Sequence, residues 1–215
     1  MKGELIMNLK KLFVAFIAAL SLSTAVVAQE AQDPNAFGDA KFGSTKEEVK
    51  TAEKDSTLVL DHNEELMFNE TSEFLGKSQN CYAFDKDGKL VAVSINVIND
   101  HEDLAKYIED YNKINEAFVQ LYGAADEQGV STDDEAILND PAKLAQAIKE
   151  GKVAATTVWK KENFTISHIL SEKMDTEGMD EESVKATVFT PICHIILAQH
   201  NSVAGAAEEG EAAAE

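Results

Sequence analysis

The chain has 215 residues, a net charge of −20 at neutral pH and no arginine. Such a charge repels nucleic-acid backbones and anionic lipid, and without guanidinium groups no side chain can clamp a phosphate in bidentate fashion. The composition therefore excludes nucleic acid as a partner. The length suffices for one substantial core or two small ones, and a single domain over residues 42–200 is the simpler organisation.

The N-terminal residues have the features of a secretory signal peptide over residues 1–28. Lysines precede an apolar run at residues 12–22, and small or β-branched residues lead up to a cleavage site, so cleavage is expected near Ala28. The translation start is either Met1 or Met7, and nothing downstream depends on which.

No membrane span is expected in the mature chain. The apolar run is shorter than the roughly 20 residues that cross a bilayer, and acidic residues follow it. The first cysteine is Cys81, so no lipidated cysteine stands at the cleavage point. These features predict a periplasmic or secreted protein, with residues 29–41 as a flexible lead-in and the acidic, low-complexity residues 201–215 as a disordered tail.

The first predicted element of the domain is a short helix. Ser44 and Glu47 have the spacing of a capping box, Phe42 can act as its hydrophobic staple, and the helix is expected to end near Glu53. The strands expected after it lie at residues 57–60 and 66–68, and a hairpin of residues 81–84 and 90–98 encloses the turn at residues 85–88.

A long helix is predicted from about Glu102 to Leu121, because apolar residues recur there at three- and four-residue steps and Gly123 follows. A shorter helix begins after Asp140 as N-cap, with Pro141 in its first turn. The other expected elements are a polar loop at 126–134, a hairpin of 155–160 and 164–170, an acidic loop at 175–182 and a last strand at 186–197.

The order of helix, strands, helices and strands predicts an α+β fold in which helices pack on an antiparallel sheet. No β-α-β alternation is present to build a parallel sheet. The two halves of the domain have similar predicted architecture, although no residue-level repeat relates them.

Four short motifs carry a resemblance to a known family. They are Phe42-Gly43-x-Thr45-x-Glu47-Glu48-Val49, Tyr82-x-Phe84-Asp85-x-Asp87-Gly88-x-Leu90, Leu121-Tyr122-Gly123 and a strand with Trp159. The pattern resembles exported bacterial domains of the β-lactamase-inhibitor-protein-like type, which share a helix-plus-antiparallel-sheet unit with small outer-membrane-assembly lipoproteins. Over residues 42–197 the resemblance implies that fold, and binding of other proteins through a sheet surface and adjacent loops. The chain lacks the lipidated cysteine of the lipoprotein branch and any counterpart of an inhibitory loop.

Cys81 and Cys193 leave two alternatives open. In an oxidising compartment they are expected to form a disulfide, but each also lies in a strand-like apolar stretch, where a cysteine can be buried separately as a small hydrophobic residue.

No catalytic residue, metal ligand or cofactor is predicted. The sequence has no nucleophile motif, and Cys193 and His194 are strand neighbours that point to opposite faces. The histidines lack metal-ligand spacing and are expected to be structural or solvent-facing; they are His62, His101, His168, His194 and His200.

Two acidic clusters resemble parts of calcium loops. Asp85-x-Asp87-Gly88 lies in a predicted hairpin, and residues 175–182 lack the spacing of an EF-hand loop. The acidic residues of the first cluster are explained by the needs of a tight turn. Those of the second are explained by a loop exposed to solvent. The alternative is a calcium-binding protein, or a hydrolase with a site built from acidic side chains.

Trp159 is the only tryptophan. It either packs on the long helix or marks an exposed binding face, where tryptophan is enriched. The sequence as a whole predicts a non-enzymatic protein-binding or envelope-associated domain. Its negative charge indicates a partner protein with a basic or neutral surface.

Overall fold

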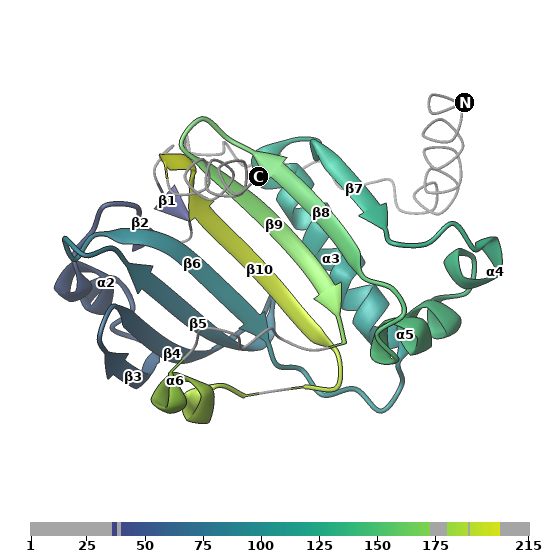
Figure 1. Ribbon diagram of the computed structural model, residues 1–215, viewed down its shortest axis with the longest axis horizontal. Helices are drawn as coiled ribbons and strands as arrows, with labels where there is room; N and C mark the ends of the chain where they lie inside the picture. The colour runs from purple at the N-terminus through teal and green to yellow at the C-terminus, as the bar shows by residue number, and fades with distance from the viewer. Residues whose placement is uncertain (1–35, 38–39, 173–179, 189, 203–215) are drawn as a thin grey trace, which may run out of the picture. The chain divides into compact units, whose positions relative to one another are not determined.

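The computed structural model describes residues 36–37, 40–172, 180–188 and 190–202, without the side chain of Cys193 (Figure 1). The expected signal peptide, most of the acidic loop at 175–182 and nearly all of the expected tail lie outside the described residues. Among the helices that the structure describes, none has the length and apolar character needed to cross a membrane.

The first half of the domain is one helix followed by four strands. Its elements are α2 (Lys46–Ala52), β3 (Thr57–His62), β4 (Glu65–Ser72), β5 (Gly76–Phe84) and β6 (Leu90–Val97). The capping box is shifted by one residue from the prediction, because Thr45 has the extended backbone of an N-cap and exchanges hydrogen bonds with Glu48. The β5–β6 turn is as predicted, with Gly88 at a φ of 71°.

The second half repeats this plan with additional helices. Its elements are α3 (Ala105–Tyr122), β7 (Glu127–Val130), α4 (Glu135–Leu138), α5 (Pro141–Lys149), β8 (Ala155–Lys160), β9 (Phe164–Ser171), α6 (Glu181–Ala186) and β10 (Cys193–His200). Two predictions are wrong here. The expected loop at 126–134 contains β7 and Asp134, the N-cap of α4, and the last strand begins at Cys193 rather than at residue 186, which ends α6.

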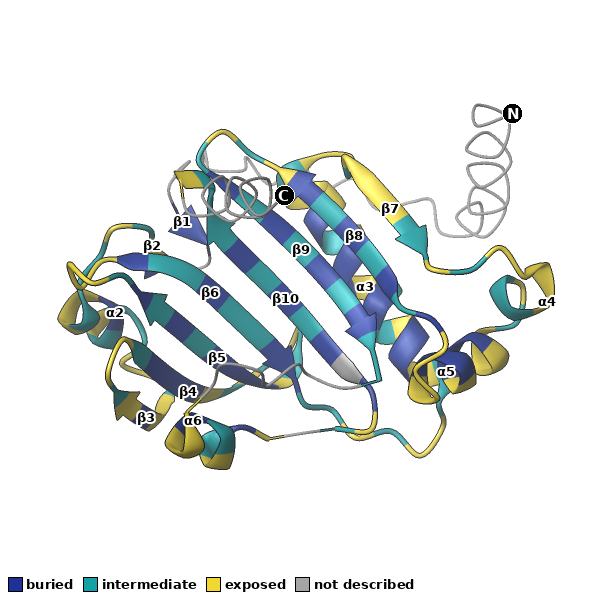
Figure 2. Cartoon of the chain, in the orientation of Figure 1, coloured by how far each residue is buried: buried dark blue, intermediate teal, exposed yellow. Residues whose placement is uncertain are grey.

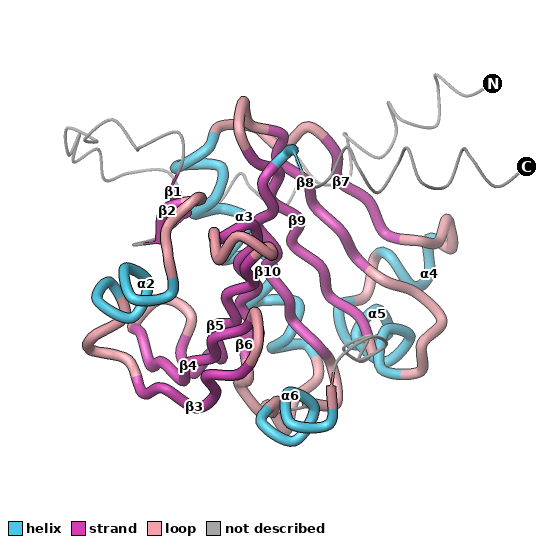
Figure 3. Tube along the Cα trace, turned by 60° about the vertical axis from the view of Figure 1, so that its left-hand side comes forward, coloured by secondary structure: helices cyan, strands magenta, loops and turns pink. Residues whose placement is uncertain are grey.

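All eight long strands form one antiparallel sheet in the order β3-β4-β5-β6-β10-β9-β8-β7. The fourth strand of each half therefore pairs with the other at the centre, where His194 lies opposite Val97. The edge strands β3 and β7 lie far apart on either side of the molecule (Figure 3). The predicted α+β fold is confirmed, and the element order agrees in part, since β7 precedes α4 and α6 separates β9 from β10.

The helices α3 and α5 lie on one face of the sheet (Figure 1). The apolar stripe of α3 packs there through Ile114 and Phe118 against residues such as Ile166 and Ile196, which have no exposed surface. Burial of large side chains of this kind stabilises by roughly 1.5 to 3 kcal/mol each. The shorter helix α6 lies on the opposite face, next to β3.

Part of the expected flexible lead-in belongs to the fold. β1 (Ala36–Phe37) pairs with β2 (Ala40–Lys41). The ring of Phe37 meets that of Phe118 edge to face, with centroids 6.3 Å apart, and stacks on Tyr122 at 6.5 Å. These contacts bury Phe37 in the main core, so the ordered domain starts before residue 42.

Candidate functional site

One face of the sheet carries no helix over β6, β10, β9 and β8 in the part of the chain that the structure describes (Figure 1). Along β8, β9 and β10, buried side chains on the α3 side alternate with half-buried or exposed side chains on the opposite side (Figure 2). The outward side chains meet in register, since Leu197 lies between Ser94 and Ser167. We call this surface the open sheet face; it comprises Ser94, Thr156, Val158, Ser167, Ile169, Ile195 and Leu197.

The open sheet face is uncharged, although the chain has a net charge of −20. Strands β6, β9 and β10 contain no Asp, Glu or Lys, and His168 and His194 point toward α3. Charge returns at the rim, where Lys160 of β8 pairs with Glu127 of β7 at 2.7 Å. A weakly charged centre with a polar rim is the composition of protein–protein interfaces.

A hollow of about 350 Å³ lies where the open sheet face meets the edge strand β7. Thr156 and Val158 of the open sheet face line it, together with Glu127, Gly129 and Ser131. A Cβ added at Gly129 would meet no atom within 4 Å, so the glycine leaves room above the strand. The open sheet face therefore continues into a recess at the sheet edge.

On the other side of the sheet, a buried polar network joins α3 to β8, β9 and β10. His168 Nδ1 lies 2.6 Å from Asn115 Oδ1, and His168 Nε2 lies 3.2 Å from His194 Nδ1. The Tyr111 ring stacks on His168 with centroids 4.3 Å apart, and its hydroxyl lies 2.8 Å from Thr157 Oγ1. All five side chains are buried.

The amide of Asn115 fixes the protons in this network. Its Nδ2 donates to Thr157 Oγ1 at 3.2 Å, so its Oδ1 is the atom that accepts from His168 Nδ1. Neutral His168 then has a lone pair at Nε2, to which His194 Nδ1 donates. His194 is left with a lone pair at Nε2, and this buried atom has no hydrogen-bond partner among the described residues.

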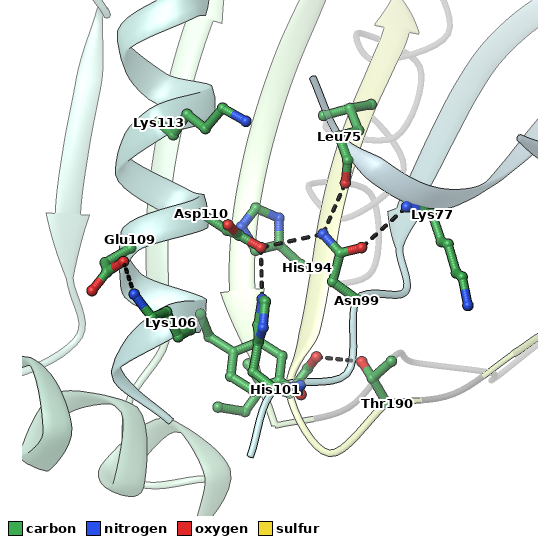
Figure 4. A network of polar contacts seen from close by, with 12 residues as sticks. Leu75, Lys77, Asn99, His101, Lys106, Glu109, Asp110, Lys113, Thr190 and His194 are labelled. Atoms are coloured by element: carbon green, nitrogen blue, oxygen red, sulfur yellow. Dashed lines mark hydrogen bonds and ion pairs between the residues drawn. The ribbon is translucent and has the colours of Figure 1, made fainter. Parts of the chain in front are cut away.

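Burial keeps both imidazoles neutral. It lowers the pKa of His194 to about 4, an effect that Asp110 opposes and His101 reinforces. Burial, and then the neighbouring His194, also lowers the pKa of His168. His101 Nε2 and Asn99 Nδ2 both donate to Asp110 Oδ2, at 2.8 and 3.2 Å, beside His194 (Figure 4). Because both rings are buried and bonded to side chains of α3 and the sheet, the network holds α3 on the sheet.

The remaining histidines are also in polar pairs. His62 lies between two carboxylates of α6 and its N-cap, and His200 Nδ1 lies 2.6 Å from Ser202 Oγ. Within the described ranges, no three His, Cys, Asp or Glu side chains are arranged to hold a metal ion. The structure brings His168 and His194 together through the β9–β10 register, which the sequence spacing does not show.

The expected disulfide is not formed. Cys81 is a free thiol, and burial raises its pKa to about 12, with a further contribution from Glu65. Strand β6 lies between β5, which carries Cys81, and β10, which begins at Cys193. Their backbones are therefore at least about 10 Å apart, two strand spacings, whereas a disulfide joins Cα atoms about 4.4 to 6.8 Å apart. Of the alternative, two separately buried cysteines, the structure tests only Cys81, because the side chain of Cys193 lies outside the described residues.

Trp159 is not part of an exposed binding face. Its side chain has no exposed surface, its ring meets Phe118 with centroids 5.3 Å apart, and its Nε1 donates to the carbonyl of Gly123 at 3.1 Å. It packs on the long helix, the other alternative that the sequence leaves open.

The Asp85–Gly88 cluster is explained by its turn. Asp85 Oδ1 accepts hydrogen bonds from the backbone N–H groups of Asp87 and Lys89, each at 2.9 Å. An aspartate that bonds the backbone two residues ahead is the usual device of a tight turn. The carboxylate therefore organises the hairpin.

Comparison with known proteins gives no relative. No protein-family model matches the chain, and neither the curated proteins nor the solved structures contain a significant match.

Proposed function

We propose that this chain is an exported, non-enzymatic protein that binds a partner protein through its open sheet face. The observation that carries the proposal is the uncharged centre of a surface made by four adjacent strands that no described helix covers, in a protein with a net charge of −20. If the face only had to be wetted by solvent, charged side chains would be expected on it, as they are on the edges of the sheet.

The side chains of the face support binding of a folded surface. Val158, Ile169, Ile195 and Leu197 offer branched apolar contact, and Ser94, Thr156 and Ser167 between them offer hydroxyl groups for hydrogen bonds. All are held by a regular sheet whose opposite side is tightly packed, so little side-chain or backbone entropy is lost on binding.

The charge of the molecule indicates the partner. The uncharged centre requires a neutral contact surface, and the acidic surroundings favour basic groups on the partner around it. Such a complex forms faster at low salt, because the attraction between the rims is screened within about 10 Å at 0.1 M ionic strength.

Export and family membership are part of the proposal. The N-terminal pattern of lysines, apolar residues and small residues supports a periplasmic or secreted location. The resemblance to the β-lactamase-inhibitor-protein-like domains rests on the four sequence motifs, and it implies the same use of a sheet surface.

The experiment compares two lysine substitutions in residues 29–215 used as bait for cross-linking capture from the envelope or secreted fraction of the source organism. Ser167→Lys places a charge at the centre of the open sheet face. Gln120→Lys places the same charge on the exposed side of α3, on the other side of the sheet. Capture of the protein bound by the unmodified bait should fall at least about tenfold with Ser167→Lys, because an ammonium group must be desolvated at the interface.

The Gln120→Lys bait is the matched control and should capture the same protein in the same amount. Equal capture by both variants would refute binding through the open sheet face, and equal loss would attribute the effect to net charge. Thermal melting of both baits checks that the fold is intact.

A further inference from the structure

Residues 180–188 form a segment that we call the strap: Asp180, the helix α6, Thr187 and Val188. The strap lies on the same side of the sheet as the open sheet face, but over β3 to β6. The strand registers show which side the strap is on. Gln79 lies opposite Asn96, and Asn96 lies opposite Ile195 of the open sheet face, so the three side chains point to the same side of the sheet. Gln79 and Asn96 bind the strap. The strap therefore occupies the half of the sheet face that is not open.

The strap is attached through its backbone by two amide side chains of the sheet. Gln79 Nε2 donates to the carbonyl of Ala186 at 2.9 Å, and Gln79 Oε1 accepts from the N–H of Val188 at 3.0 Å. Asn96 Nδ2 donates to the carbonyl of Val188 at 2.9 Å. This is the way in which a binding groove holds an extended peptide.

Apolar burial contributes little to this attachment. Ser183 and Thr187 are the buried side chains among residues 180–188, and Val188 is 41% exposed. Ser183 Oγ donates to a carboxylate oxygen of Glu65 on β4. A segment held mainly by hydrogen bonds, each contributing about 1 kcal/mol net, opens at a much lower free energy than the core.

His62 holds the N-terminal end of the strap by both of its ring nitrogens. Nε2 lies 3.2 Å from Asp180 Oδ2, and Nδ1 lies 3.0 Å from Glu182 Oε2. A carboxylate can only accept, and a neutral imidazole has one N–H. Both contacts are hydrogen bonds only when the ring carries two protons; in the neutral ring, one nitrogen lone pair faces a carboxylate oxygen.

Asn63 Nδ2 also donates to Asp180 Oδ2, at 3.3 Å, and this hydrogen bond does not depend on the charge of His62. The other charged groups around His62 do not replace it. On α6, Glu181 pairs with Lys185 at 2.6 Å. Glu65 lies opposite His62 on β4 and is bound to Ser183 of the strap. Asp61, next to His62 on β3, is bound by two lysines of α2, Lys46 at 3.2 Å and Lys50 at 2.7 Å. The Ser183 N–H that donates to Asp180 lowers the pKa of that carboxyl, so Asp180 stays ionised.

We propose that the strap is displaceable, that double protonation of His62 strengthens the attachment of its N-terminal end, and that its release extends the open sheet face over β3 to β6. The strap is held more tightly when the ring carries both protons and is loosened when it loses one, because one nitrogen lone pair then faces a carboxylate oxygen. The surface uncovered includes Gln79 and Asn96, whose amides become free to bind the backbone of a partner segment. Strap opening requires no partner, so this proposal can fail while the proposed function holds, and the reverse.

Cys81 reports on the opening, because it lies on this face between Gln79 and Ala83, opposite Met67, and is partly covered. The experiment alkylates the full domain and reads modification of Cys81 by peptide mass spectrometry, in the unmodified protein and in His62→Gln. Glutamine is uncharged, so it cannot replace a doubly protonated imidazole between the two carboxylates. The ratio of the two rates cancels the intrinsic effect of pH on thiol reactivity.

The expected ratio of His62→Gln to the unmodified protein is about ten at about pH 5.5 and about one at about pH 8, since one charged hydrogen bond is lost only where the ring is protonated. Glu182→Gln, at an exposed position of α6, should give the same pattern without altering β3. His200→Gln, at the end of β10, is the matched control and should give a ratio of one at both pH values. A ratio of one at about pH 5.5 in both the His62 and Glu182 variants, or equal ratios at the two pH values, would overturn the proposal.

Discussion

Acid sensitivity of the buried His168–His194 pair is the sharpest prediction for stability. Both rings are neutral in the folded protein because burial lowers their pKa, for His194 to about 4 from an ordinary value of about 6.5. Between these two values the unfolded chain binds a proton at His194 and the folded chain does not. The free energy of unfolding therefore falls as the pH is lowered through this window, and below about pH 4 the contribution of His194 stops changing.

The magnitude follows from the shift. A difference of roughly two and a half pH units at about 1.4 kcal/mol each makes the loss from His194 alone about 3 kcal/mol, and His168 adds to it in the same direction. The perturbation is His194→Asn, whose Nδ2 can still donate to His168 while the partnerless Nε2 is removed. The variant should be less stable at neutral pH because of the smaller side chain.

The assay is urea unfolding at several pH values between about 7 and 4.5, followed by fluorescence of Trp159, the only tryptophan, which is fully buried. The difference in unfolding free energy between the unmodified protein and His194→Asn should shrink by up to about 1.4 kcal/mol per pH unit as the pH falls. Carboxylate titration and net-charge effects cancel in this difference. A difference that is independent of pH would refute the assignment of His194 as a buried neutral ring.

Three further outcomes are expected. Ile196 faces the core, so Ile196→Lys should abolish folding. Its neighbour Leu197 faces the open sheet face, so Leu197→Lys should lower the free energy of unfolding by under about 1 kcal/mol. Circular dichroism of the purified variants distinguishes the two results. Asp140→Ala should cost about 1 kcal/mol in urea unfolding, because its carboxylate accepts from two first-turn N–H groups of α5. Native Cys81 should alkylate at least about a hundredfold more slowly than in denaturant at about pH 5.5, where the strap is closed, since burial raises its pKa to about 12.

The elements with strong local signals are those that the sequence predicts well. Asp140 followed by proline marks the start of α5, and its carboxylate caps the helix as expected. Gly88 stands at the turn of the β5–β6 hairpin with a positive φ. The apolar spacing of α3 needs no tertiary information, because a stripe at helical period has to face a core wherever the helix lies.

The elements that the sequence misses depend on distant partners. β7 is four residues long and contains Gly129, and it exists because its backbone pairs with β8, where Gly129 lies opposite Thr156. The stretch from residue 186 to Cys193 has the composition of a strand, but α6 and the strap take its first residues to the other half of the sheet, where Gln79 and Asn96 bind them. Local propensity has no information about these contacts.

The sequence contains one indication of the open sheet face, which is the absence of charged residues from β9 and β10. A strand with one solvent-facing side is expected to carry charge at every second position, yet β9 and β10 carry none on either side. Because charge is absent from both alternating sets of positions, the second face of these strands is also expected to be covered or to bind a partner. The His168–His194 contact left no such signal, because it arises from the register of two strands.

The most direct test of the central claim is site-specific photo-cross-linking. A photoreactive side chain replaces Ser167 on the open sheet face or, as the control, Gln120 on the exposed side of α3, and each variant is irradiated in the envelope or secreted fraction. Binding through the open sheet face predicts one dominant cross-linked protein from position 167, none from position 120, and loss of the product when Leu197→Lys is added. The same product from both positions, or none from position 167, would contradict it.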